Sequence, residues 1–341
     1  MDKRSTGKRW IAVIIAIVLF AISLVSGGLI SSVGKDKDNK DMLGEKFKDL
    51  SGVNKEVIQG TNPTQKILVV DVDGVITDQS TNSYFKASGF DYDFFMEQLD
   101  KAKEDNTIKA VILKVNSPGG GVYASEQMKD KILKLKEETQ MPIYTVMGSM
   151  AASGGYYISA PTDRIYASNE TFTGSIGVIM SSLNLKGLYD KYGIKQENIT
   201  SGKFKDIGST GKEMSKEDRE ILQSLVDNAY ERFVKVVADG RSMSESEVKK
   251  IADGRIYDGA QAKENGLVDE IGNMDMAVKD LSDELDLKDP TVYRLKKNPY
   301  DFSSLFQKAT NLLNKDKSDL QILNDMLNKS DRPEPMYLYG E

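Results

Sequence analysis

The chain has 341 residues, 39% of them hydrophobic, and a formal net charge of −6. This apolar content is enough for a sizeable core, and charges of both signs without a clustered basic face argue against a nucleic-acid partner. The chain contains no cysteine and no histidine, which excludes disulfides, a thiol nucleophile, a Ser-His-Asp triad and an HExxH zinc site. A hydrolase of this composition must take its general base from a carboxylate, a lysine or a tyrosine, and we expect no metal and no other cofactor.

The N-terminal region contains an uncharged apolar run, residues 10–30, which is about 21 residues long and could cross roughly 30 Å of hydrocarbon. Lys3, Arg4, Lys8 and Arg9 precede it, so the positive-inside rule places residues 1–9 in the cytoplasm. A cleaved signal peptide is the alternative, but the run is long for one and no clear A-x-A site follows. We therefore expect a single-pass anchor in the cell membrane that holds the rest of the chain on the extracytoplasmic side.

A charged stretch, residues 31–65, follows the anchor, and we expect it to be a tether between the membrane and the folded domain. Beyond it, short apolar runs lack the period-two alternation of half-exposed strands, which predicts strands covered on both faces. These runs cover residues 67–76, 108–115 and 142–147. Helical spacing separates them, so the pattern predicts an α/β fold with a largely parallel sheet.

The later part of the domain is expected to contain shorter strands and one long helix. The strand candidates are residues 164–167, 171–179 and 194–200. The helix begins near Ser215, whose spacing to Asp218 fits a capping box. We assign residues 66–298 to the folded domain and residues 299–341 to two short amphipathic helices and an extended tail, which ends in MYLYGE.

Two small-residue segments directly follow buried strands, where ligands bind in open α/β sheets. The first is NSPGGG at residues 116–121, whose glycines allow backbone N–H groups to approach a ligand. It is either an oxyanion hole or an ordinary turn. The second is GSMAASGGYY at residues 148–157, in which Ser153 precedes a short helix. Ser153 is either a nucleophile in the positive field of that helix or a plain helix cap.

The general base is harder to place. Lys203 and Lys205 lie in the segment SGKFKD, which follows the last strand candidate. A lysine acts as a base only when it is deprotonated, and most lysines in such a chain are solvated surface charges. The spacing does not choose between these two lysines, nor does it select this loop.

Five segments occur in the order NSPGGGV, MGSMAASGGYYIS, TGSIGVI, SGKFKDI and GRIYDGAQAKENGLVDEIG. Together they resemble the signal peptide peptidase A family, which comprises serine–lysine proteases related in fold to Clp protease and the crotonases. The resemblance covers residues 67–272, and the N-terminal anchor resembles that of the half-size, membrane-anchored members. It implies a crotonase-like β-α spiral domain that assembles into a homo-oligomeric ring, with active sites near subunit boundaries.

Carried over to this chain, the resemblance makes Ser153 the nucleophile and Lys205 the general base. It also implies that Gly120 supplies an oxyanion-binding N–H, with Gly154 as a second donor, and that the Ser175 hydroxyl orients the lysine. The expected activity is cleavage of apolar, extended peptides with small residues at the cut site, such as remnant signal peptides. The rate is expected to rise towards alkaline pH.

Two functions from other classes compete with this interpretation. One is a catalytically silent membrane scaffold on the same fold, and the other is a crotonase acting on coenzyme A thioesters, which the extracytoplasmic placement disfavours. The MYLYGE tail likewise has two interpretations. It either lies in a neighbouring active site as a regulator or substrate, or it is a solvated terminus.

Overall fold

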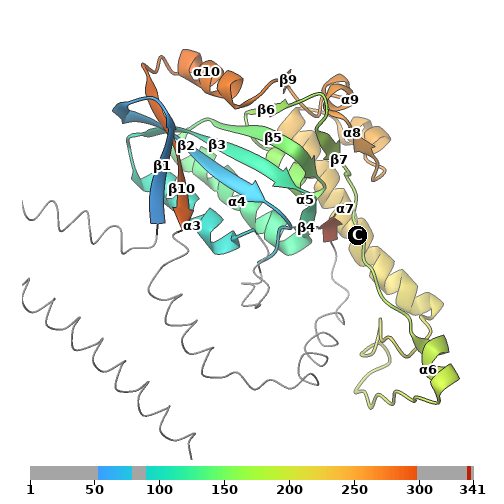
Figure 1. Ribbon diagram of the computed structural model, residues 1–341. Helices are drawn as coiled ribbons and strands as arrows, with labels where there is room; N and C mark the ends of the chain where they lie inside the picture. Colours follow the sequence, from blue (N-terminus) through green and yellow to red (C-terminus); the bar gives the residue numbers. More distant parts are fainter. Residues whose placement is uncertain (1–52, 79–89, 298–335, 339–341) are drawn as a thin grey trace, which may run out of the picture. The chain divides into compact units, whose positions relative to one another are not determined.

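The computed structural model describes residues 53–78, 90–297 and 336–338 (Figure 1). The residues from Lys55 to Leu295, together with 336–338, belong to one compact unit. The expected anchor (residues 10–30) lies outside the described residues, as do residues 31–52 of the expected tether (31–65) and most of the expected C-terminal segment (299–341). Residues 53–59 and 62–65 of that tether instead belong to two strands of the main sheet. Within the described ranges, no helix is long and apolar enough to cross a bilayer.

The main sheet follows the order β1-β10-β2-β3-β5-β6-β9, and β7 extends it from β5 and pairs in turn with β8. From β10 to β9 every neighbouring pair is parallel, as is β5 with β7, whereas β7 pairs antiparallel with β8. The predicted α/β fold with a largely parallel sheet is therefore confirmed. The strands are β1 Val53–Gln59, β2 Asn62–Asp73, β3 Ile108–Ser117, β5 Ile143–Ala152, β6 Arg164–Ala167, β7 Phe172–Gly174, β8 Ile256–Tyr257, β9 Glu270–Ile271 and β10 Pro290–Lys297.

Helices cover both faces of this sheet, which explains why its central strands are apolar throughout. Alternate residues of β2 enter different cores: Leu68 and Val70 pack with α3, α4, α5 and α7, whereas Val69 packs with α10. Figure 1 shows α10 on one face and α3 and α4 on the other. The helices are α3 Tyr92–Glu104, α4 Val122–Thr139, α5 Gly154–Ser159, α6 Lys186–Tyr192, α7 Lys216–Arg241, α8 Glu245–Ile251, α9 Gly259–Glu264 and α10 Met274–Glu284.

The long helix α7 begins with the predicted capping box. The Ser215 side chain accepts a hydrogen bond from the Asp218 N–H, and the Asp218 carboxylate accepts one from the Ser215 N–H. The buried apolar residues of α7, such as Phe233 and Val237, lie in its C-terminal half. Its N-terminal half leaves Ile221 and Leu225 exposed.

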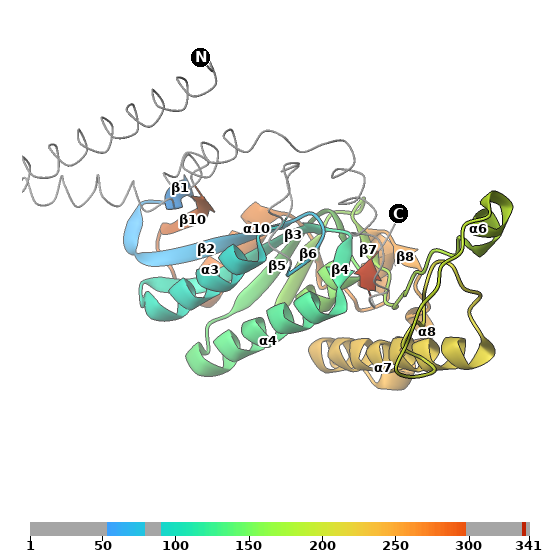
Figure 2. The same cartoon turned by 90° about the horizontal axis from the view of Figure 1, so that it is seen from below.

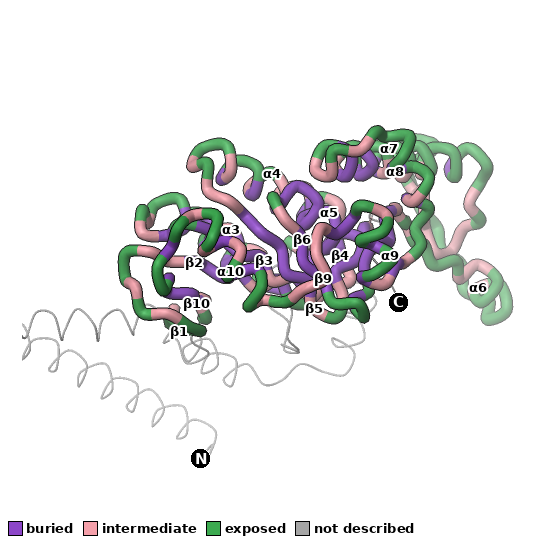
Figure 3. The backbone as a smooth tube through the Cα atoms, turned by 90° about the horizontal axis from the view of Figure 1, so that it is seen from above, coloured by how far each residue is buried: buried purple, intermediate pink, exposed green. Residues whose placement is uncertain are grey.

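Residues 180–215 form an arm that contains α6 and lies beside the N-terminal half of α7 (Figure 2). Its backbone is mostly exposed, in contrast to the buried strands of the sheet (Figure 3). The expected strand at residues 194–200 is wrong, because this segment has no regular structure and Ile194 and Ile199 are exposed. Its β-branched residues have local strand propensity, but none of the strands that the structure describes pairs with them.

Candidate active site

The NSPGGG segment forms a tight turn at the end of β3. The Ser117 hydroxyl donates a hydrogen bond to the Gly74 carbonyl at 2.6 Å and accepts one from the Gly119 N–H at 3.1 Å. A short strand, β4 (Gly119–Gly121), follows, and Gly120 forms a bridge with Ile76. A Cβ at Gly120 would stand 1.9 Å from the Ile76 carbonyl oxygen, so only glycine fits. The turn is therefore fixed by side-chain hydrogen bonds and by close backbone approach.

Ser153 lies between β5 and α5, with φ 53° and ψ −117°. This conformation is rare for a residue with a side chain, and it persists only where the surroundings enforce it. A helix cap has extended backbone and accepts a hydrogen bond from the first turn, whereas the Ser153 side chain makes no such bond. The cap interpretation therefore fails. A serine on a strained strand-to-helix turn has the geometry of a nucleophile elbow. The sequence did not reveal this, because AASGG lacks the G-x-S-x-G signature.

The turn at β4 and the start of α5 lie against each other. In the β3–β5 pair, Ser117 lies opposite Ala151, which aligns the two strand ends. A Cβ on Gly154 would stand 3.1 Å from the Gly120 nitrogen and 3.1 Å from the Gly119 Cα. The structure therefore brings together three of the expected site residues, Ser153, Gly120 and Gly154. Two backbone N–H groups beside a strained serine are suited to bind the oxyanion of an acyl-transfer intermediate.

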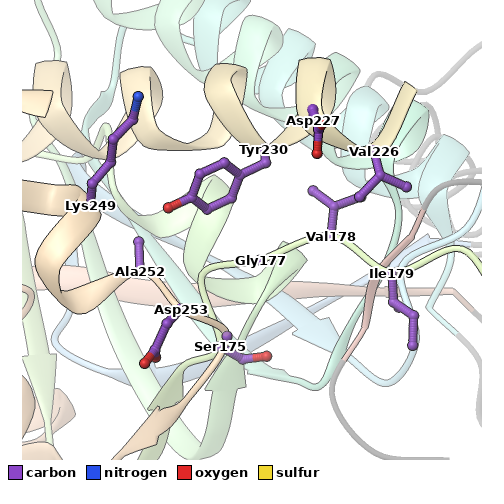
Figure 4. A pocket seen from close by; sticks show the side chains of 11 residues that line it. Ser175, Gly177, Val178, Ile179, Val226, Asp227, Tyr230, Lys249, Ala252 and Asp253 are labelled. Carbon is purple, nitrogen blue, oxygen red and sulfur yellow. The ribbon is translucent and has the colours of Figure 1, made fainter. Parts of the chain in front are cut away.

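Ser175 lies near Ser153, on the opposite side from β4. The Ser153 N–H donates to the carbonyl of Gly174, the residue before Ser175, at 2.8 Å. The Ser175 N–H in turn donates to the Arg255 carbonyl at 2.8 Å. The Ser175 side chain is 7% exposed and lines a cavity of about 510 Å³ together with Tyr230 and other residues (Figure 4).

Of the three charged groups that line this cavity, Lys249 and Asp253 have oppositely charged partners, and Asp227 accepts a hydrogen bond from the Gln223 side chain at 2.8 Å. The Lys249 ammonium lies 2.7 Å from the Glu231 carboxylate. The Asp253 carboxylate accepts hydrogen bonds from the Arg255 guanidinium, which lower the pKa of Asp253 to about 2. Neither group is a candidate for the general base at neutral pH, since Lys249 is held as a cation and Asp253 is a very weak base.

The structure does not bring Lys205 to Ser153 within one chain. Lys205 is an exposed residue of the arm, and its neighbour Lys203 forms an ion pair with Glu217 in the first turn of α7. Near the other end of α7, the Phe233 ring packs against Tyr157 of α5, with ring centroids 5.0 Å apart. The helix rises about 24 Å from Glu217 to Phe233. Lys205 and Ser153 therefore lie near opposite ends of this helix.

The C-terminal tail lies on the proposed oxyanion turn. Strand β11 (Met336–Leu338) pairs antiparallel with β4, and Tyr337 lies opposite Gly120. On its other edge, Met336 exchanges two backbone hydrogen bonds with Ile179, at 2.9 and 3.1 Å. A Cβ on Gly119 would stand 2.0 Å from the Tyr337 carbonyl oxygen and 2.5 Å from the Gly154 nitrogen. The extended segment 336–338 thus lies against this turn of its own chain, so neither a place in a neighbouring copy nor a solvated terminus describes these three residues.

The Tyr337 side chain is fully buried in an aromatic pocket. Its ring stacks on Tyr157 at 4.8 Å between centroids and lies 4.7 Å from Phe233. Burial raises the pKa of the Tyr337 hydroxyl, so the group stays protonated and donates to the Ala229 carbonyl at 3.0 Å. The sequence predicted an extended tail but offered no signal for this pocket, because its walls come from α5 and α7.

Comparison with known proteins places the chain among proteases. Residues 135–288, which include Ser153, Ser175 and Lys205, match the model of peptidase family S49. A protein of Enterococcus faecium named as signal peptide peptidase SppA is 42% identical over 350 residues, covering 100% of this chain and 99% of that protein. The chain belongs to peptidase family S49. Its resemblance to the signal peptide peptidase A family is thereby confirmed.

Other relatives in family S49 agree with this assignment. A protein of Methanocaldococcus jannaschii named as a protease is 36% identical, covering 84% of this chain and 87% of that protein. The chloroplastic serine protease SPPA of Arabidopsis thaliana is 32% identical over 72% of this chain and 36% of its own length. The chain is accordingly a serine protease of the signal peptide peptidase type. The strained Ser153 beside two N–H donors is the site that fits this activity.

Proposed function

We propose that this protein is a membrane-anchored endopeptidase that degrades apolar peptides, such as cleaved signal peptides, on the extracytoplasmic face of the membrane. Ser153 is the nucleophile and Lys205 the general base. The observation that supports this most strongly is the positive φ of Ser153 next to the N–H groups of Gly120 and Gly154. No ligand or metal ion needs to be added to complete the chemistry of an acyl transfer at such a serine.

The proposed reaction proceeds in two steps. Deprotonated Lys205 takes the Ser153 proton as Oγ attacks the peptide carbonyl, and the oxyanion forms against the two N–H groups. Lys205 then gives that proton to the leaving amine, and the peptide bond breaks. Water, activated by the same lysine, hydrolyses the acyl-enzyme and restores free Ser153. Ser175 is placed beside the nucleophile, where its hydroxyl would hold the incoming lysine.

The tail suggests how a substrate binds. β11 lies between β4 and Ile179 as an added strand, so main-chain hydrogen bonds on both edges support an extended peptide. The aromatic pocket around Tyr337 supports a preference for a large apolar side chain in one subsite. The preference for small residues at the cut site, expected from the sequence, concerns a different subsite and stays a prediction.

The position of Lys205 indicates that the active site forms between two copies of the chain. The arm carries exposed apolar side chains, among them Leu183, Leu188 and Ile194, which a monomer would leave in water. Docking the arm of one copy against the nucleophile of the next would bury these side chains and bring Lys205 to Ser153. The same contact, repeated around an axis, closes a homo-oligomeric ring. The anchor at residues 10–30 would hold this ring at the membrane.

The test compares full-length wild type with Ser153→Ala, Lys205→Ala and Lys203→Ala. We expect the first two variants to lose hydrolysis of an apolar fluorogenic peptide, and Ser153→Ala also to lose labelling by a fluorophosphonate. Lys203→Ala is the matched control and should keep its activity. Because the base must be deprotonated, the wild-type rate should rise between about pH 6 and pH 9. Loss of activity in Lys203→Ala alone would refute the choice of base.

A wild-type protein that neither labels nor hydrolyses peptides would favour the silent-scaffold interpretation. Turnover of acyl thioesters without peptide cleavage would favour the crotonase alternative. Either outcome would refute the proposed peptidase activity.

A further inference from the structure

Ser125 is a buried hydroxyl next to the proposed oxyanion site. It lies in the first turns of α4, which begins directly after the glycine turn at β4. Its side chain is 0% exposed. Within the part of the chain that the structure describes, the Ser125 Oγ has no hydrogen-bond partner.

This arrangement is unfavourable for the resting fold. Burying a hydroxyl without a partner forfeits its hydrogen bonds to water, so a native structure rarely contains one without a reason. Other buried hydroxyls near the site have partners: Ser117 bonds Gly74, and Thr173 donates to the Ala151 carbonyl at 2.7 Å. An alanine at position 125 would fill nearly the same space without this cost. Stability of the fold therefore does not explain Ser125.

The surroundings of Gly154 supply a different explanation. The point where a Cβ on Gly154 would stand is 2.7 Å from the Ser125 Oγ and 3.1 Å from the Gly120 nitrogen. The Gly154 nitrogen lies about 2.5 Å from the same point by covalent geometry. The Ser125 hydroxyl thus packs against Gly154, close to the two N–H groups that are assigned to the oxyanion.

We propose that the Ser125 hydroxyl is a third donor to the oxyanion, an inference that rests on the proposed function. Without an acceptor in the resting state, the Ser125 O–H is free to rotate towards the negative oxygen that forms between Gly120 and Gly154. In a site closed to water, a donor that meets its partner only as charge develops stabilises the transition state more than the bound peptide. Ser125 therefore contributes to kcat rather than to substrate binding.

The test compares Ser125→Ala and Ser125→Cys with wild type, each as the full-length assembled protein. We expect kcat to fall about 10- to 100-fold in both variants with KM unchanged, because alanine removes the donor and a thiol donates weakly. A peptide boronate, which forms a tetrahedral adduct with Ser153, should lose affinity by the same factor, whereas a product peptide should bind as before. Ser282→Ala is the control, since its hydroxyl donates to the Val278 carbonyl on α10 and should leave kcat unchanged.

Wild-type kcat in Ser125→Ala would overturn the proposal. Full recovery of kcat in Ser125→Cys would also overturn it, because the role of Ser125 would then be packing against Gly154. If Ser125→Ala does not fold, Ser125→Cys decides alone, by its kcat and its boronate affinity. An active wild type with an unaffected Ser125 variant refutes only this inference, whereas an inactive wild type refutes the proposed function and this inference with it.

Discussion

The backbone at Ser153 is held in a conformation that its own side chain disfavours. A non-glycine residue at such angles costs about 1–3 kcal/mol, so its neighbours must enforce it. They do so through two backbone hydrogen bonds of 2.8 Å, from the Ser153 N–H to the Gly174 carbonyl and from the Tyr157 N–H to the Ser153 carbonyl. The first connects the nucleophile to β7 and the second to α5. The hydroxyl is thus positioned by elements on both sides.

Gly154→Ala tests how closely the residues next to Ser153 must pack. The added Cβ would stand 2.7 Å from the Ser125 Oγ and 3.1 Å from the Gly120 backbone. We expect overpacking to cost about 1–3 kcal/mol in the free energy of unfolding, and displacement of the N–H donors to lower kcat/KM about 100-fold. Urea unfolding and peptide hydrolysis measure the two effects.

Gly266→Ala is the matched control for this substitution. Gly266 has φ 72° and lies in the turn between α9 and β9, so alanine there should lose about 1 kcal/mol of stability yet retain kcat. If Gly154→Ala kept wild-type activity, the assignment of its N–H to the oxyanion hole would be wrong.

At the scale of elements, the short pair β4–β11 brings the tail next to the candidate active site. β4 has its outer edge next to Ser153, and an unpaired edge is a template for another strand. β11 occupies that edge, with Tyr337 filling the pocket between α5 and α7. The tail therefore has the geometry of a bound peptide that competes with substrate.

Deleting residues 331–341 should raise the rate of peptide hydrolysis at low substrate concentration, because the cleft is then free. Tyr337→Ala should raise it as well, since this variant loses the ring stack on Tyr157 and the hydrogen bond to Ala229. Tyr337→Phe keeps the stack but not the hydrogen bond, so its rate should lie between the rates of wild type and Tyr337→Ala. Initial rates at substrate concentrations below KM provide the measurement. An unchanged rate after deletion would show that the tail does not compete.

Helix α7 has two roles because its halves differ in burial. The C-terminal half carries Phe233 and Val237 into the core, whereas the N-terminal half carries the arm and exposes Ile221 and Leu225. One rigid helix of 26 residues thus connects the core to a segment that reaches away from it. This connection fixes the distance between Lys205 and the nucleophile of its own chain.

At the scale of the whole molecule, the proposed dyad requires two copies of the chain. The arm contacts the start of α7 through the ion pairs of Lys203 with Glu217 and of Lys212 with Asp218. The arm would have to fold back along about 24 Å of helix for Lys205 to reach Ser153 of the same chain. Association of two copies would leave the arm in place and bring Ser153 of the second copy to Lys205 of the first.

Mixing two inactive variants tests whether Ser153 and Lys205 of one active site come from different copies of the chain. Ser153→Ala retains Lys205, and Lys205→Ala retains Ser153, so a mixed assembly should regain part of the wild-type rate if the dyad forms between copies. Peptide hydrolysis after co-expression or subunit exchange is the measurement. A mixture of Ser153→Ala with the double variant Ser153→Ala/Lys205→Ala should stay inactive. Mixed assemblies of the two single variants that form but remain inactive would contradict a dyad between copies.

The sequence by itself determined the features that depend on neighbours along the chain. The absence of histidine and cysteine excluded most hydrolytic mechanisms, and continuous apolar runs predicted the buried strands β2, β3 and β5. The Ser215 capping box was also predictable, because it joins residues three positions apart. Residues 194–200 show the limit of such reasoning, since strand propensity without a pairing partner produces no strand.

Only the tertiary structure decided the features that depend on contacts between distant segments. The positive φ of Ser153 is enforced by Gly174 of another strand, and Tyr337 meets Gly120 although the two lie far apart in the sequence. The unpartnered hydroxyl of Ser125 is meaningful only because α5 places Gly154 against it. Local spacing carries no information on which strand ends and helices meet, because that choice is made by the pairing of the sheet and the packing of the core.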